Sequence, residues 1–146
     1  MLKNKVAIIT GGSRGIGRAI ADAYAKNGTS LLLVALHDER LQQTAAEIAA
    51  AGGVVEAVGG DIADPALSQE VVGKALARFG RVDILVNCAG MVTRTPMGRL
   101  SDEDWHRVID VNLHGTYYMC QAALPGMCEQ GRGKVINVTS QMAWLP

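Results

Sequence analysis

The sequence predicts an α/β fold in which helices cover both faces of a doubly wound parallel sheet. Short apolar runs without polar alternation, the first at residues 6–9, are typical of strands that are buried on both faces. Segments with helical periodicity separate these runs, and glycine-rich turns join the two kinds of segment. This regular alternation favours βαβ units with right-handed crossovers.

Each element can be placed from its own residues. Strands are predicted at residues 6–9, 31–36, 54–58, 82–86 and 134–139, and helices at residues 16–27, 39–51, 65–79 and 105–127. Pro65 at the first helical position and Gly80 after the last one delimit the third helix. Residues 91–100 are expected to form a surface loop, and residues 101–104 have the form of a capping box before the long fourth helix.

The composition excludes several classes of protein. The chain has 146 residues, of which 49% are hydrophobic, and this is enough for one domain with its own core. Because 14 basic residues balance 14 acidic ones, no broad basic field exists to bind nucleic acid or an anionic membrane. Neither a secretory leader nor a membrane-spanning run is recognised, so we expect a cytoplasmic protein.

Cysteine and histidine show no metal-binding pattern. Cys88, Cys120 and Cys128 are odd in number and lack zinc-site spacing, so we expect buried free thiols and neither a disulfide framework nor a metal. His106 and His114 are expected to be ordinary polar residues on helix faces.

The most informative stretch follows the first strand, where glycines stand at positions 11, 12, 15 and 17. A glycine turn between a buried strand and a helix N-terminus directs free backbone N–H groups and the positive end of the helix dipole at one crevice, which suits a phosphate. A P-loop would need Lys after the last glycine, but Arg18 and Ala19 follow Gly17. The commoner dinucleotide fingerprint would need a glycine at position 20, where Ile20 stands.

The remaining pattern, T-G-x-x-x-G-x-G over residues 10–17, resembles the cofactor loop of the short-chain dehydrogenase/reductase family. The resemblance runs through Asp61 after the third strand, residues 87–90 after the fourth, Asn112 in the long helix and Ser140 after the fifth. It implies a Rossmann-like fold, with residues 1–146 forming an incomplete dinucleotide-binding domain that is truncated after the fifth strand. It also implies a homo-oligomer, either a tetramer or a dimer, with the helix around Asn112 at the subunit interface.

The resemblance implies a role for each matching residue. Ser140 would hydrogen-bond the substrate carbonyl or hydroxyl, Asn112 would support a proton relay through water, and Asp61 would meet the adenine. Two alternatives stay open, in which Asp61 is a solvated turn residue and Asn112 caps a kink. Cys88 stands where the family usually has a second Asn, which removes one amide's hydrogen bonds. The expected cofactor-binding residues are Gly11, Ser13, Arg14, Gly15, Ile16, Gly17, His37, Asp61, Ile62, Asn87, Ala89 and Gly90.

The choice between NAD and NADP depends on the residues at the end of the second strand. An acid there would bond the 2′-hydroxyl of NAD, whereas a basic group would accept the 2′-phosphate of NADP. Ala35 and Leu36 occupy these positions and supply neither determinant. Arg14, with His37 nearby, favours NADP, while Asp38 keeps NAD possible.

The family's general acid/base is a Tyr-x-x-x-Lys pair on the helix after the fifth strand, and residues 1–146 contain no such pair. The favoured hypothesis is that the sequence is the N-terminal part of a reductase that resembles 3-oxoacyl-[acyl-carrier-protein] reductases or sugar and polyol dehydrogenases. The alternative is a non-catalytic dinucleotide-binding module. An intact mass near 15.4 kDa for the functional protein would contradict the favoured hypothesis.

Overall fold

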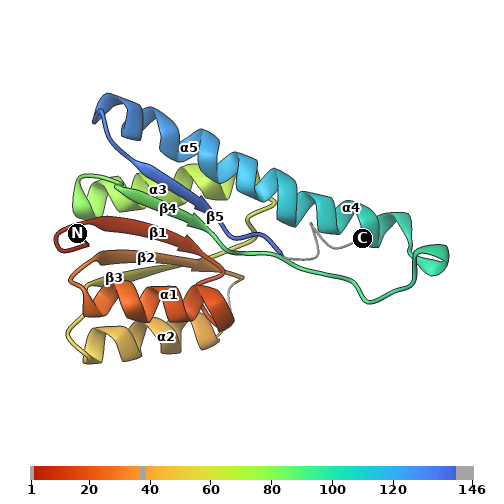
Figure 1. Cartoon of the computed structure of the whole chain (residues 1–146), viewed down its shortest axis with the longest axis horizontal. Helices are drawn as coiled ribbons and strands as arrows, with labels where there is room; N and C mark the ends of the chain where they lie inside the picture. The colour runs from red at the N-terminus through yellow and green to blue at the C-terminus, as the bar shows by residue number, and fades with distance from the viewer. Residues whose placement is uncertain (1, 37–38, 141–146) are drawn as a thin grey trace.

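The computed structural model describes residues 2–36 and 39–140 (Figure 1). Its elements, in chain order, are β1 (Val6–Thr10), α1 (Gly15–Lys26), β2 (Ser30–Ala35), α2 (Glu39–Ala50), β3 (Val55–Gly59), α3 (Pro65–Phe79), β4 (Ile84–Asn87), the 3₁₀ turn η1 (Met97–Arg99), α4 (Asp102–Ile109), the π-helical turn η2 (Asp110–His114), α5 (Gly115–Glu129) and β5 (Lys134–Asn137).

The five strands form one parallel sheet in the order β3-β2-β1-β4-β5. From β1 the chain builds outward through β2 and β3, and it then crosses back to add β4 and β5 on the other side. The strand order therefore reverses between β1 and β4, and in such sheets ligands bind in the crevice beyond the carboxyl ends of the strands at this point. The predicted Rossmann-like, doubly wound fold is confirmed.

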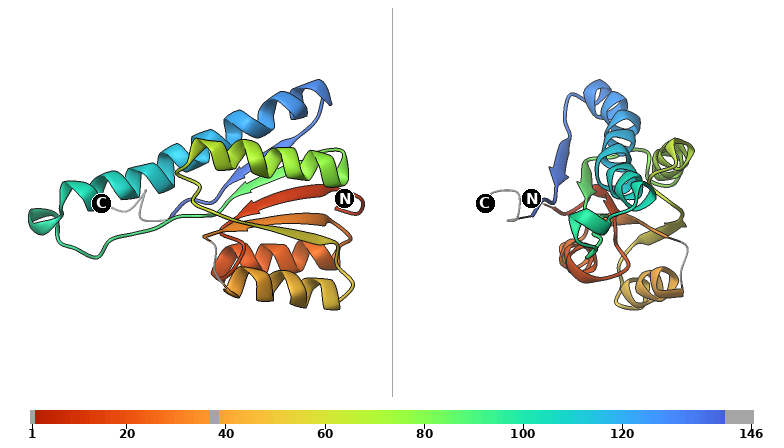
Figure 2. Two further views of the ribbon diagram at one scale, coloured as in Figure 1. Left: turned by 180° about the vertical axis from the view of Figure 1, so that it is seen from behind. Right: turned by 90° about the vertical axis from the view of Figure 1, so that its right-hand side faces the viewer.

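Two helical layers cover the sheet, with α1 and α2 on one face and α3 and α5 on the other (Figures 1 and 2). All five residues of β1 are buried, and they alternate between the two layers. Ala7 and Ile9 pack with the core on the α1–α2 side, whereas Ile8 packs with the core on the α3–α5 side. This explains why the strand is a continuous apolar run rather than an alternating one.

Two strands have shorter bounds than the sequence predicts. β4 begins at Ile84 rather than residue 82, and the Asp83 carboxylate accepts the Val6 N–H at 3.0 Å, so that a side chain takes the place of a strand-to-strand bond. β5 ends at Asn137 rather than residue 139, because its partner strand ends at Asn87, which is paired with Asn137.

The predicted long helix is divided into α4, η2 and α5. A π-helical turn spans residues 110–114 and includes Asn112, and such turns occur frequently at functional sites. Pro125 lies inside α5, which continues to Glu129 instead of ending near residue 127. The Ser101 side chain accepts the Asp104 N–H at 3.1 Å, which confirms the predicted cap of α4.

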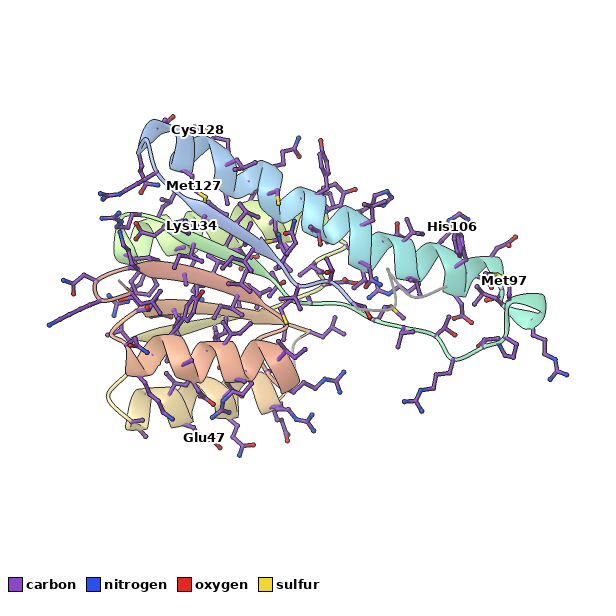
Figure 3. The ribbon with its side chains drawn as sticks, in the orientation of Figure 1. Glu47, Met97, His106, Met127, Cys128 and Lys134 are labelled. Atoms are coloured by element: carbon purple, nitrogen blue, oxygen red, sulfur yellow. The ribbon has the colours of Figure 1, made fainter. Side chains whose placement is uncertain are left out.

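The expectation of buried thiols is wrong for Cys128, which is exposed on the last turn of α5, where the neighbouring Met127 faces the core instead (Figure 3). Cys88 and Cys120 are half-buried. Figure 3 also shows His106 on α4 with its side chain directed away from the sheet. Among the described helices, none combines the length and the apolar character that crossing a membrane requires.

Candidate functional site

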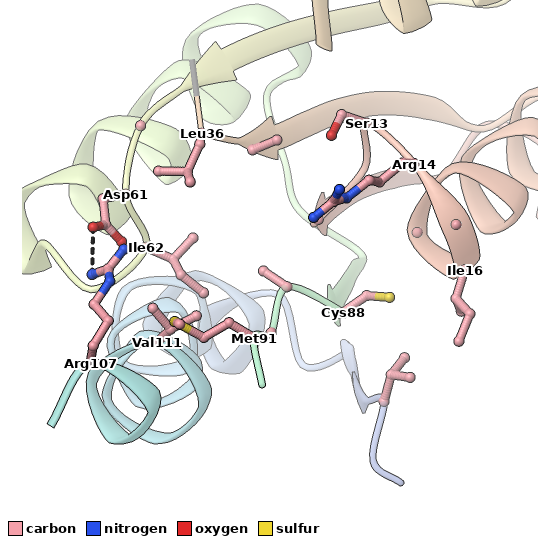
Figure 4. Close-up of a pocket in the computed structure, with 18 residues that line it drawn as sticks. Ser13, Arg14, Ile16, Leu36, Asp61, Ile62, Cys88, Met91, Arg107 and Val111 are labelled. Atoms are coloured by element: carbon pink, nitrogen blue, oxygen red, sulfur yellow. Dashed lines mark ion pairs between the residues drawn. The ribbon is translucent and has the colours of Figure 1, made fainter. Parts of the chain in front are cut away.

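A pocket of about 460 Å³ lies beyond the carboxyl ends of the strands (Figure 4). Its volume is in the range of small-molecule and cofactor sites. The loops after β1, β2, β3 and β4 form most of its wall, and the α4–η2 helix closes one side. The lining residues are Gly11, Ser13, Arg14, Gly15, Ile16, Gly17, Ala35, Leu36, Gly60, Asp61, Ile62, Cys88, Ala89, Gly90, Met91, Arg107, Val111 and Val138.

The glycine loop approaches its neighbours so closely that two positions have no space for a side chain. A Cβ at Gly17 would lie 2.2 Å from the Gly11 carbonyl oxygen. At Gly11, where φ is +68°, a Cβ would lie 2.9 Å from the backbone of Ala89, in the loop after β4. These two glycines therefore allow the turn into α1 and the contact between the two loops that meet at the switch point.

The N-terminus of α1 opens into the pocket without a side-chain cap. Arg14 is the N-cap residue in an extended conformation, its side chain makes no capping bond, and the first turn of α1 contains no acidic residue. The first N–H groups of a helix have no partner within the helix, and its dipole is positive at this end. Together with the glycine loop, this end of α1 has the properties of a phosphate site.

Thr10 holds the loop after β4 beside the glycine loop. Its buried hydroxyl oxygen accepts the N–H groups of Cys88 and Ala89, each at 3.0 Å. The hydroxyl in turn lies 3.5 Å from the Val86 carbonyl oxygen. Two of the pocket-lining loops are thereby fixed to each other by one side chain.

Asp61 follows β3 and uses both carboxylate oxygens. One oxygen accepts the Ala63 N–H at 3.0 Å, and the other forms an ion pair with Arg107 of α4 at 2.7 Å (Figure 4). Burial by itself raises the pKa of Asp61, but the bonds from Ala63 and Arg107 outweigh it and lower the pKa overall. The carboxylate is therefore a fixed negative charge in the pocket wall, and its contact with an adenine stays a prediction.

Asn112 ties the helical wall to the loop after β4. Its amide nitrogen donates to the Met91 carbonyl oxygen, and its amide oxygen accepts the Met91 N–H, both at 2.8 Å. The side chain thus bonds to the loop instead of capping a kink in its own helix. It does not line the pocket, but it positions Met91, which does.

Two other predicted residues that the structure describes lie outside the pocket lining. Asn87 was expected at the cofactor, but it is buried between strands, where its amide nitrogen donates to the Asn137 side chain at 2.9 Å. Ser140 is exposed and lies two residues beyond Val138, which lines the pocket. His37 lies outside the described residues. The other predicted cofactor residues all line the pocket.

Several lining residues could not be recognised in the sequence. Arg107 and Val111 carry no motif, and they reach the pocket only because α4 and η2 pack across the ends of the strands. Leu36 supplies no cofactor determinant in the sequence, but it lines the wall near Asp61 (Figure 4). Cys88 lines the pocket, and burial raises the pKa of its thiol.

The strand order and the position of the pocket define an α/β protein of the Rossmann type. Residues 5–146 match the family model described as short chain dehydrogenase, so the chain belongs to the short-chain dehydrogenase/reductase family. The predicted resemblance is confirmed.

The relatives differ in how much of their length the chain spans. It is 42% identical over 142 residues to a D-threitol dehydrogenase of Mycolicibacterium smegmatis, covering 97% of this chain and 55% of that protein. It is 39% identical over 151 residues to the short chain dehydrogenase/reductase dpmpG of Macrophomina phaseolina, covering 99% of this chain and 86% of that protein. A metagenomic short-chain oxidoreductase solved in complex with NADP superposes with a TM-score of 0.92 at 36% identity, over 99% of this chain and 66% of that one.

Proposed function

We propose that this chain forms the cofactor-binding part of an NAD(P)-dependent oxidoreductase that prefers NADP(H) and interconverts a carbonyl compound and a secondary alcohol. The observation that carries the proposal is the uncapped end of α1 beside the glycine loop, at the switch point of the sheet. A Cβ at Gly11 or Gly17 would collide with the backbone of the loops beside this end of α1, so these glycines allow the tight turn that leaves the first N–H groups of the helix open to a ligand. A pyrophosphate has the charge and size for this position.

The preference for NADP rests on the charges along the pocket wall. Arg14 lines the pocket, and Figure 4 shows its guanidinium group directed into it. Ala35 and Leu36 line the wall where an acid would favour the 2′-hydroxyl of NAD. A guanidinium group can bind a phosphate through two parallel hydrogen bonds, so Arg14 is proposed to accept the 2′-phosphate.

The bound nicotinamide would supply or accept the hydride. Ser140, beyond the carboxyl end of β5, is proposed to hydrogen-bond the oxygen of the substrate. Asn112 is proposed to support proton transfer, and its two bonds to Met91 fix the loop after β4, which lines the pocket.

The substrate class has two candidates. A small polyol is favoured by the similarity to the D-threitol dehydrogenase. A 3-oxoacyl thioester is the alternative that the family resemblance implies.

The test is turnover by the protein as its own gene produces it. We expect NADPH oxidation with a ketose or a 3-oxoacyl thioester, or NADP reduction with a polyol such as D-threitol. We expect the 146-residue chain by itself to bind the cofactor without turnover, since it contains no Tyr-x-x-x-Lys pair. Cofactor binding without turnover by the native product would favour the non-catalytic module, and measurable turnover by the 146-residue chain would contradict the assigned proton-transfer chemistry.

A further inference from the structure

The ion pair between Arg107 and Asp61 joins two elements that are far apart in the sequence. Arg107 belongs to α4 and Asp61 to the turn after β3, and both line the pocket. Figure 4 places the pair at one end of the pocket, beside Ile62, Val111 and Leu36. An apolar slot with a charged group at its end is suited to a flat heterocycle that carries a polar edge.

The Asp61 carboxylate is held in one orientation by bonds on both oxygens, from the Ala63 N–H and from Arg107. An ionised carboxylate has about four lone-pair sites, so two bonds leave acceptor capacity for a ligand. About a third of the side chain is exposed, at 36%, so this capacity is accessible. The carboxylate can therefore accept a hydrogen bond from an amino group in the slot but not from a carbonyl group.

Arg107 also anchors the wall on which it stands. None of the residues of α4, all of which are described, is buried, so packing contributes little to fixing this helix. The segment is tied to the strand ends by the Arg107–Asp61 pair at 2.7 Å and by the bonds between Asn112 and Met91 at 2.8 Å. Loss of the first tie would leave the carboxylate bonded to the Ala63 N–H alone and the helical segment tied by Asn112 alone.

We propose that Arg107 is a positioning residue that holds the Asp61 carboxylate for the 6-amino group of the adenine. This inference rests on the proposed function, because it takes the adenine end of a dinucleotide as the occupant of the slot. It extends that function by naming a residue that sets selectivity for the base. Adenine presents a 6-amino donor, whereas hypoxanthine presents a 6-oxo acceptor that the same carboxylate would repel.

The experiment compares NADPH with its hypoxanthine analogue, deamino-NADPH, by calorimetric titration of the full chain. The unmodified protein is expected to bind NADPH at least about tenfold more tightly, the factor that 1.4 kcal/mol represents. Arg107→Met keeps the apolar stem and removes the charge, and it is expected to reduce this ratio to about threefold or less while weakening NADPH binding. Arg107→Lys keeps a charge near Asp61 and is expected to restore most of the ratio.

Arg78→Met is the matched control, because Arg78 pairs with Glu56 at 3.2 Å outside the pocket. It is expected to leave both affinities unchanged. A purely structural role for Arg107 would weaken both ligands equally, so an unchanged ratio in Arg107→Met overturns the inference. If Arg107→Met does not fold, Arg107→Lys decides, and a ratio as low as about one with that folded variant would contradict the proposal. Failure of the unmodified protein to bind either nucleotide would overturn the proposed function itself.

Discussion

Two aspartates at opposite ends of the same sheet have similar partners and different consequences. Asp83 precedes β4 at the amino end, and Asp61 follows β3 at the carboxyl end. Each accepts a backbone N–H, from Val6 and Ala63 respectively, and each pairs with an arginine. Their exposure differs, because 5% of the Asp83 side chain is accessible to solvent, whereas 36% of the Asp61 side chain is accessible.

This difference in exposure indicates that the two ends of the sheet have different roles. Asp83 lies at the amino end of the sheet within reach of Lys5, Arg81 and Arg132, and its bond with the Val6 N–H joins β1 to the start of β4. Asp61 has bonding capacity left over and faces the pocket. We therefore expect that changes at the amino end of the sheet reduce stability without changing ligand affinity. Changes at the carboxyl end are expected to reduce ligand affinity more than stability.

The largest effect on stability is expected for Asp83→Ala. The change leaves the Val6 N–H without an acceptor and removes the charge that Arg81 and Lys5 face. Leaving a buried donor without its acceptor costs about 1–3 kcal/mol, so urea unfolding should show a loss of this size. Glu56→Gln, in an exposed pair with Arg78, is the control and should cost less than about 1 kcal/mol. Equal losses for the two variants would contradict the role of Asp83.

The largest effect on binding is expected for Gly17→Ala. The new Cβ would lie 2.2 Å from the Gly11 carbonyl oxygen, so the backbone of the loop must move. The NADPH affinity should fall by about a hundredfold, which corresponds to about 2.7 kcal/mol. Gly98→Ala is the control, because a Cβ at Gly98 meets no atom within 4 Å. Calorimetric titration measures both, and unaltered binding by Gly17→Ala would show that the ligand lies elsewhere.

A smaller effect is expected in the pH dependence of stability. Burial raises the pKa of Asp83, but the bonds from Val6 and Arg81 and the charge of Lys5 outweigh it and lower the pKa overall. A carboxylate with a lowered folded-state pKa stabilises the protein above its unfolded pKa of about 3.9 and loses that contribution as the pH falls through the folded-state value. The urea concentration at the midpoint of unfolding should therefore decrease as the pH is lowered from about 5 to about 3. The decrease should be less steep in Asp83→Asn. An identical slope in that variant would contradict the assignment.

The smallest effect concerns the thiols. Cys128 is exposed, whereas Cys88 is half-buried in the pocket and its pKa is raised by burial. Ellman's reagent should modify Cys128 first, and NADPH should slow the reaction of Cys88 further. Cys128→Ser identifies the fast phase. Rapid modification of Cys88 that NADPH does not affect would place the ligand outside this pocket.

The fold could be predicted because its signals are local. Each signal depends on residues that are close together in the chain. Examples are the apolar run at β1, the proline and glycine at the ends of α3 and the glycine loop. The wall of the pocket could not be predicted in the same way. Arg107 meets Asp61 only because the helices pack across the strand ends, and no motif encodes that contact.

Asn87 also shows what a sequence motif cannot predict. Its position in a familiar motif predicts that its backbone approaches the cofactor, and this stays a prediction, whereas the pleat of β4 directs its side chain to Asn137 of β5. A motif therefore identified which loop lines the pocket and not which side chains of that loop face it.

We propose that the pocket binds a nicotinamide dinucleotide through the glycine loop and that Arg14 selects the 2′-phosphate. Parallel calorimetric titrations of the unmodified chain and of Arg14→Ala with NADPH and NADH test it most directly. We expect the unmodified chain to bind NADPH at least about tenfold more tightly than NADH, and Arg14→Ala to lose most of that difference. Tighter binding of NADH, or an NADPH preference that survives in Arg14→Ala, would contradict the account.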